Sequence, residues 1–93
     1  MINEHDELET LKNEIALCDE WLSEFCYHSD KWSENTSYYY KHRVEAFFDT
    51  YISNTAFITS AKKRFESKLA EGSKLNYVFK FQFDKKKMQA YKR

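Results

Sequence analysis

The chain has 93 residues, of which 42% are hydrophobic and 18% aromatic, and its formal net charge is zero. A chain of this size forms one domain, which we expect to span residues 1–93. One glycine and no proline favour long helices and argue against glycine-rich phosphate loops. No apolar run is long enough to cross a membrane, and the acidic start is unlike a signal peptide. We therefore expect a cytoplasmic protein that does not bind a membrane.

The charge is divided unevenly along the chain. Residues 1–35 carry ten carboxylates and two lysines, and residues 36–93 carry five carboxylates and thirteen Lys or Arg. The two parts therefore have formal charges of −8 and +8. An asymmetry of this kind points to interaction surfaces rather than to a reaction.

The first predicted element is a helix over residues 4–27. Trp21 lies off its main apolar stripe, so this helix has a second apolar surface to cover. Cys18 and Cys26 are separated by about 12 Å along the helix, which is too far for a disulfide bond between them. The stripe itself recurs at spacings of three and four residues and consists of Leu8, Leu11, Ile15, Cys18, Leu22 and Phe25.

The second predicted element is a long helix over residues 36–71, after a polar loop at 28–36. Apolar residues keep one helical phase from Tyr40 to Leu69. The residues at 53–55, Ser-Asn-Thr, compete for backbone hydrogen bonds, so a break there stays open as an alternative. Gly72 suits the position that follows a helix.

A different period begins after Gly72. Aromatic and polar residues alternate over 75–83, which predicts a β-strand. We see no second segment of this kind, so the arm needs its own copy, the sheet edge of a partner, or a place against the helices. A basic tail at 85–93 is expected to fray.

These elements predict a mainly α fold. We expect an antiparallel helical hairpin of two long helices, the second with a possible break near 53–55, followed by the C-terminal β-strand arm. Antiparallel packing would bring the acidic start of the first helix toward the basic residues Lys62 to Lys68, although exposed ion pairs contribute only about 0–1 kcal/mol each.

Motifs for metal binding and catalysis are weak. Cys18, Cys26, His28 and His42 are metal-ligand types, but the sequence lacks the short-spaced pairs typical of zinc sites. It also lacks a P-loop, a dinucleotide fingerprint and a nucleophile elbow. We therefore expect no metal, no cofactor, no small-molecule substrate and no enzymatic activity.

Binding is the function that the sequence favours. In its size, its Tyr/Lys/Asn-rich composition and its lack of catalytic motifs, the chain resembles accessory proteins of phages and other mobile elements. We expect a non-catalytic protein-binding module, a small inhibitor or adaptor of a larger protein. The alternatives are a nucleic-acid-associated regulator that binds through the basic and aromatic C-terminal region, and a structural homodimer paired through its strand. The candidate partner-binding residues are Trp32, Tyr38, Tyr39, Tyr77, Phe79, Lys80, Phe81, Lys85, Lys86, Lys87, Tyr91, Lys92 and Arg93.

Overall fold

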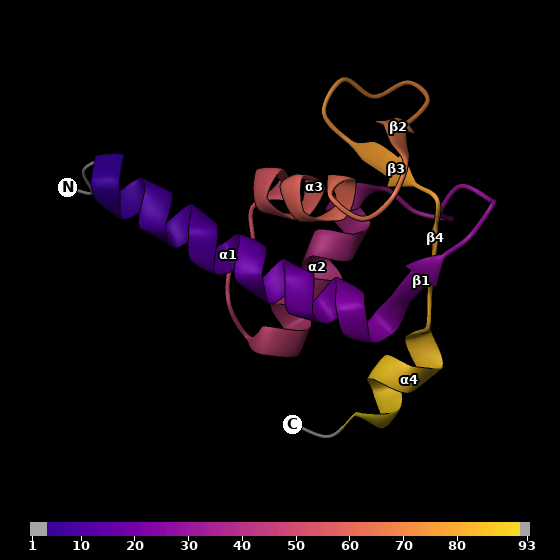
Figure 1. Ribbon diagram of the computed structural model, residues 1–93, viewed down its shortest axis with the longest axis horizontal. Helices are drawn as coiled ribbons and strands as arrows, with labels where there is room; N and C mark the ends of the chain where they lie inside the picture. The colour runs from indigo at the N-terminus through magenta and orange to yellow at the C-terminus, as the bar shows by residue number, and fades with distance from the viewer. Residues whose placement is uncertain (1–3, 92–93) are drawn as a thin grey trace.

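The computed structural model describes the backbone of residues 4–91 and the side chains of residues 7–91. Within this range the chain forms four helices and two antiparallel sheets of two strands each (Figure 1). This is a small α+β fold, so the predicted helical hairpin with a C-terminal arm is wrong. The elements are α1 (Glu4–Phe25), β1 (Cys26–His28), α2 (Ser37–Phe48), α3 (Asn54–Lys62), β2 (Ser67–Leu69), β3 (Tyr77–Phe79), β4 (Phe81–Phe83) and α4 (Lys85–Ala90).

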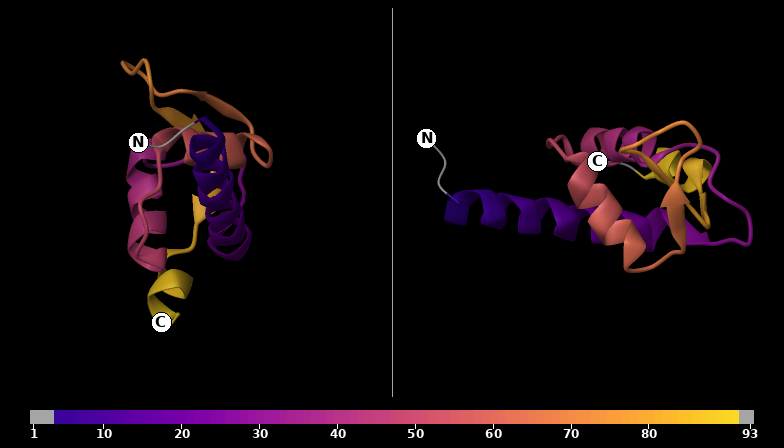
Figure 2. Two further views of the ribbon diagram at one scale, coloured as in Figure 1. Left: turned by 90° about the vertical axis from the view of Figure 1, so that its left-hand side faces the viewer. Right: turned by 90° about the horizontal axis from the view of Figure 1, so that it is seen from above.

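Helix α1 is the longest element, and it is buried over only part of its length. Its carboxyl-terminal half packs against α3 and carries Cys18, Trp21 and Leu22, each fully buried. Its amino-terminal half extends beyond the rest of the molecule (Figures 1 and 2), and Leu8 is 53% exposed. The predicted apolar stripe is therefore in the core only from the middle of the helix onward.

The predicted helix over 36–71 is interrupted, and its last part is not helical. Helix α2 ends at Asp49, whose φ of 54° is left-handed and whose backbone N–H donates to the carbonyl of Glu45. Ser53 then begins α3, because its hydroxyl accepts the N–H of Ala56 at 3.1 Å, which is the usual role of a serine N-cap. After Lys62 the chain turns and becomes β2, where a helix was expected.

The predicted strand at 75–83 is present as β3 and β4, separated by a bend at Lys80. Both halves pair within the chain: β3 with β2, and β4 with β1. The expectation that this segment lacks a partner strand in the chain is therefore wrong. Strands of three residues are too short to show an alternating pattern of their own, so the sequence did not reveal β1 and β2. Gly72, with φ of 78°, lies in the connection between β2 and β3 rather than after a helix.

The core is built around the indole of Trp21. Its Nε1 donates to the sulfur of Met88 at 3.3 Å, which anchors α4 against α1. The tail is therefore helical from Lys85 to Ala90, and not frayed as predicted. Ring contacts at centroid distances of 5.0–6.5 Å, mostly edge-on or tilted as aromatic pairs prefer, join Trp21 to Phe25, Tyr40, Phe57 and Phe83.

Helices α1 and α3 run in the same direction. At the start of α3, the backbone N–H of Ser53 donates to Glu14 Oε1 at 2.8 Å. Just after the end of α3, Lys63 Nζ lies 2.9 Å from Asp19 Oδ2. The packing is therefore parallel, and the middle of α1, rather than its acidic start, meets the first basic residues.

Candidate functional site

A groove of about 640 Å³ lies between the loop after β1, strand β4 and the start of α2. The loop, the first turn of α2 and strand β4 each contribute lining residues. Tyr40 and Phe81, both buried, separate the groove from the core. The lining residues are Ser29, Lys31, Trp32, Ser33, Glu34, Asn35, Tyr39, Tyr40, Phe81, Gln82, Phe83 and Lys85.

The loop wall is held in place by hydrogen bonds. Ser33 donates its backbone N–H to the carbonyl of Phe79 at 2.7 Å, and its hydroxyl donates to the carbonyl of Asn35 at 2.8 Å. The hydroxyl of Tyr40 accepts the N–H of Asn35 at 3.4 Å. Burial raises the pKa of Tyr40, so this phenol is neutral at physiological pH. These bonds fix the groove before any ligand arrives.

The charge around the groove is positive. Lys31 and Lys85 line it and are exposed. The guanidinium of Arg43 lies 5.3 Å from the ring centroid of Tyr39, close enough for a cation–π contact. Glu34 is the one acidic side chain among the lining residues. Two lysines and one carboxylate therefore line the groove, and Arg43 lies against the ring of Tyr39 without lining the groove itself.

The structure brings four of the predicted binding residues to this groove: Trp32, Tyr39, Phe81 and Lys85. Phe81 is buried, so it contributes little exposed surface to the groove. Trp32 is partly covered, because Lys68 Nζ and Lys80 Nζ lie 4.4 and 5.2 Å from its ring centroid. Lys80 therefore does not line the groove itself, but it contacts Trp32, which does.

The other predicted residues lie elsewhere. Phe79 is fully buried, and Lys62 covers the ring of Tyr77 at 4.2 Å. Tyr91 packs its ring against Phe25 at 5.5 Å. Tyr38 contacts His42 at 4.6 Å, Lys87 pairs with Glu24 at 3.4 Å and Lys86 is exposed on α4, whereas Lys92 and Arg93 lie outside the described residues.

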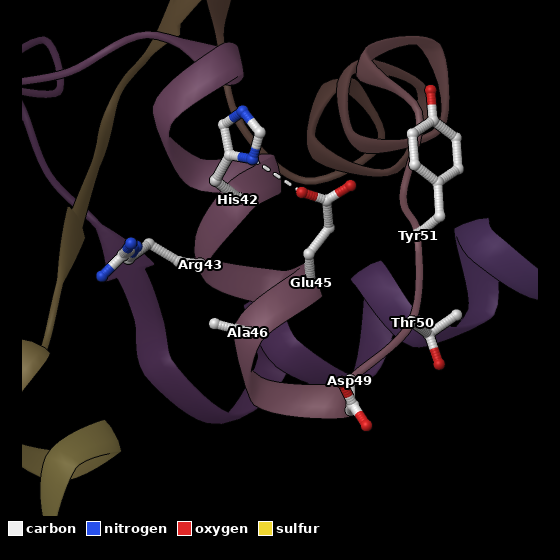
Figure 3. Close-up of a pocket in the computed structure, with 7 residues that line it drawn as sticks. All are labelled: His42, Arg43, Glu45, Ala46, Asp49, Thr50 and Tyr51. Carbon is white, nitrogen blue, oxygen red and sulfur yellow. Dashed lines mark hydrogen bonds and ion pairs between the residues drawn. The ribbon is translucent and has the colours of Figure 1, made fainter.

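A second, open depression of about 530 Å³ lies along α2 and the turn that follows it. His42 Nδ1 and Glu45 Oε1 are 2.6 Å apart, and Figure 3 shows them facing each other while Arg43 points away. Glu45 also accepts the backbone N–H of Ile52 at 3.0 Å, so it fastens the turn between α2 and α3. Burial opposes ionisation of Glu45, but the bonds from Ile52, His42 and Lys41 lower its pKa below the usual value.

This depression has one half of a catalytic arrangement. A carboxylate that orients an imidazole is found in acyl-transfer sites, which also need a nucleophile within reach. Among the residues that line the depression, Thr50 carries the hydroxyl that most resembles a catalytic nucleophile. This hydroxyl donates instead to the carbonyl of Phe48 at 3.2 Å. The geometry fits a structural brace better than a reactive centre.

The two cysteines are buried as free thiols. Burial raises the pKa of Cys18 to about 12, with a further contribution from the neighbouring carboxylates of Asp19 and Glu14. Burial also raises the pKa of Cys26. Thiols in such surroundings are poor nucleophiles and poor metal ligands. Among the described residues, no three His, Cys, Asp or Glu side chains form a group suited to a metal ion.

Several groove residues were not singled out from the sequence. Ser33 and Asn35 belong to a polar loop with no periodicity, and their role depends on hydrogen bonds to segments far along the chain. No local sequence pattern marks Lys31 as a groove residue either. Only the aromatic side chain of Trp32 in an otherwise polar loop marked this region.

Comparison with protein-family models, with curated proteins and with solved structures finds no match for this chain. In the described part of the chain, no helix combines the length and the apolar character needed to cross a membrane.

Proposed function

We propose that this protein is a non-catalytic protein-binding module, a small inhibitor or adaptor, and that its partner binds in the groove between the loop after β1, β4 and α2. The observation that carries the proposal is the meeting of Trp32, Tyr39 and Lys85 around one concave site. Aromatic residues beside a cation are enriched where proteins bind one another.

The properties of the groove support a protein ligand over a small molecule. Its lining comes from two regions that are distant in sequence, residues 29–40 and 81–85, and combines aromatic rings with polar and charged side chains. The loop wall is fixed by Ser33 and Asn35, so little ordering accompanies binding. A preformed site of this kind lowers the entropic cost of association.

Selection from a displayed library of random dodecapeptides on the immobilised full chain tests the proposal. We expect recovered peptides to bind the parent protein with micromolar affinity. Tyr39→Ala and Lys85→Glu should each weaken binding about tenfold, which corresponds to ~1.4 kcal/mol. Isothermal titration calorimetry with one synthetic recovered peptide measures both effects.

Lys86→Glu is the matched control, because Lys86 is the exposed neighbour of Lys85 on α4 and does not line the groove. It should leave the affinity within about twofold of the parent, since one exposed charge outside the site contributes little. Recovery of no peptide, or of peptides that bind Tyr39→Ala as well as the parent, would overturn the proposal.

Nucleic-acid binding is the second candidate, because cations and aromatic rings lie together at the groove. Lys68 and Lys80 cover the ring of Trp32, and Arg43 covers that of Tyr39, which leaves less ring surface for a base to stack on. A single-stranded oligonucleotide that binds tightly at low salt and is lost steeply as salt rises would favour this candidate instead. The homodimer alternative loses its original support, because the expected strand is already paired within the chain.

A further inference from the structure

We infer that two copies of this chain associate through the edge of β2 that faces away from β3, so that their two hairpins form one four-stranded antiparallel sheet. No residue of β2 lines the groove, so the inference is independent of the proposed function. The strand involved is β2 rather than the segment at 75–83. Figure 1 shows β2 near the upper edge of the molecule, beside β3.

The hydrogen bonds between β2 and β3 define which backbone groups of β2 face outward. The N–H of Ala70 donates to the carbonyl of Asn76 at 2.9 Å. The N–H of Lys80 donates to the carbonyl of Glu66, also at 2.9 Å. In an antiparallel pair such bonds occur at every second residue of each strand. The even-numbered residues from 66 to 70 therefore bond to β3, and the backbone groups of the odd-numbered residues point to the opposite edge.

This outer edge of β2 carries the N–H and C=O groups of Ser67 and Leu69. No residue in the described part of the chain hydrogen-bonds to these groups. Leu69 is 47% exposed, Lys68 is exposed and Ser67 is partly exposed. The far edge of β3 is closed, because Ser37 Oγ accepts the N–H of Tyr77 at 3.1 Å. In this sheet β2 is therefore the strand whose edge can pair with another extended chain.

The charges of β2 select a second copy as the occupant. In a two-fold antiparallel pair centred on Ser67, each Ser67 N–H donates to the Ser67 carbonyl of the other copy. Glu66 of each copy then lies opposite Lys68 of the other, and opposite charges at facing positions stabilise a sheet. Glu66 lies 3.5 Å from Lys80, but 64% of its side chain is exposed, so it can accept a second cation.

A register shifted by one residue is disfavoured. Centred on Lys68, it would place two lysines opposite each other, which is destabilising. A lysine usually protects an edge strand from association, but in the register centred on Ser67 it meets a carboxylate. On the other face of the sheet, Leu69 of each copy approaches Phe65 of the other, which is partly exposed. The same register thus covers apolar surface as well.

Sedimentation equilibrium of the full chain at low salt tests the inference. Because the contact is smaller than a standard interface, we expect a weak dimer with a Kd of about 100 µM. The measurement therefore covers concentrations from about 10 µM to about 1 mM, on both sides of this value. A parent protein that stays monomeric over the whole range would overturn the inference.

Two charge reversals test the register. Glu66→Lys and Lys68→Glu should each weaken the dimer at least about tenfold, because the two-fold axis brings each like-charge pair into the contact twice. An equimolar mixture of the two variants should associate within about threefold of the parent affinity, since every facing pair is then of opposite charge. A variant that fails to fold could not restore association in this way.

Lys74→Glu is the matched control, because it makes the same change of charge at an exposed residue in the connection between β2 and β3. It should leave the dimer affinity within about twofold of the parent. If Glu66→Lys dimerised as well as the parent, or if the mixed variants did not associate, the register and with it the inference would be wrong.

Amide exchange of the ¹⁵N-labelled parent gives a second readout. The amide of Ser67 should exchange at least about fivefold more slowly at ~1 mM than at ~10 µM protein, because it gains an acceptor in the dimer. The amide of Lys68 faces β3 in both states and should change less than about twofold. Dimerisation without slower exchange at Ser67 would overturn pairing through β2.

Discussion

The two halves of α1 share one apolar stripe but have different surroundings. The stripe runs at helical spacing from Leu8 to Phe25, yet Leu8 is 53% exposed and Leu22 is fully buried. The difference arises because α3 lies beside the carboxyl-terminal half only, from Glu14 onward (Figure 1). Periodicity therefore identifies the face of a helix that can be buried, but not the length over which a partner covers it.

The acidic residues of the two halves differ in the same way. In the carboxyl-terminal half, Glu14 accepts a backbone N–H, Asp19 binds Ser60 and Lys63, and Glu24 pairs with Lys87. In the amino-terminal half, Glu7 and Glu9 are exposed. Part of the charge asymmetry seen in the sequence is thus neutralised within the fold by Lys63 and Lys87, and the projecting turns present another part of it.

The largest expected difference between the halves is in thiol reactivity. In a Leu8→Cys variant, the new thiol should react with iodoacetamide at about the rate of a free thiol. Cys18 should react at least about a thousandfold more slowly, because it is buried, its pKa is raised to about 12, and labelling requires opening of the core. Peptide mapping by mass spectrometry measures both rates in one molecule. Equal rates would show that the core opens as readily as the projecting turns.

The next effect is on the free energy of unfolding. Trp21→Ala should lower it by about 3–5 kcal/mol, since the indole contacts four aromatic rings and the sulfur of Met88. Leu8→Ala should change it by less than about 0.5 kcal/mol. Urea denaturation followed by circular dichroism gives both values. A large loss in Leu8→Ala would mean that the projecting half is packed in solution.

The smallest expected effect is on the pH dependence of the free energy of unfolding. Burial opposes ionisation of Asp19, but bonds from Ser60 and Lys63 lower its pKa below the usual value. The stabilisation that this carboxylate provides is therefore present above pH ~4, where an unfolded aspartate ionises, and is lost as the pH falls through the lower folded pKa. Asp19→Asn should cost about 1 kcal/mol at pH 7 and progressively less as the pH falls below the range in which an unfolded aspartate ionises.

Glu7→Gln, in the exposed half of α1, is the control for this measurement. It should leave the free energy of unfolding unchanged at both pH values, because Glu7 is exposed at the free end of the helix. Urea titrations at pH 7 and at the lowest pH where the protein folds compare the variants. If Asp19→Asn retained the acid sensitivity of the parent, another carboxylate would have to be its source.

Local patterns in the sequence anticipated most of α1 and extended structure within 75–83, which forms β3 and β4, because each segment is long enough to show its period. They also placed Trp32, Tyr39 and Lys85 among the binding residues, although not at one site. The short strands β1 and β2 were missed, since their partners are distant and three residues carry no alternation. A break near 53–55 was left open as an alternative, and the helix does break just before Asn54, where the hydroxyl of Ser53 starts α3. The groove itself depends on Ser33 bonding to Phe79, a contact that no local pattern encodes.

The pairing of β1 with β4 also sets the order in which the molecule can fold. Tyr27 lies opposite Gln82, so most of the chain must be present before this pair can form. During synthesis α1 emerges before α3 and β4, so Trp21 gains its aromatic neighbours from those elements only later. Contacts between such distant segments slow folding, because a large loop must close before they form. The nascent chain therefore lacks part of the cover of the Trp21 indole until those segments have been made, and exposed apolar surface of this kind is what chaperones bind.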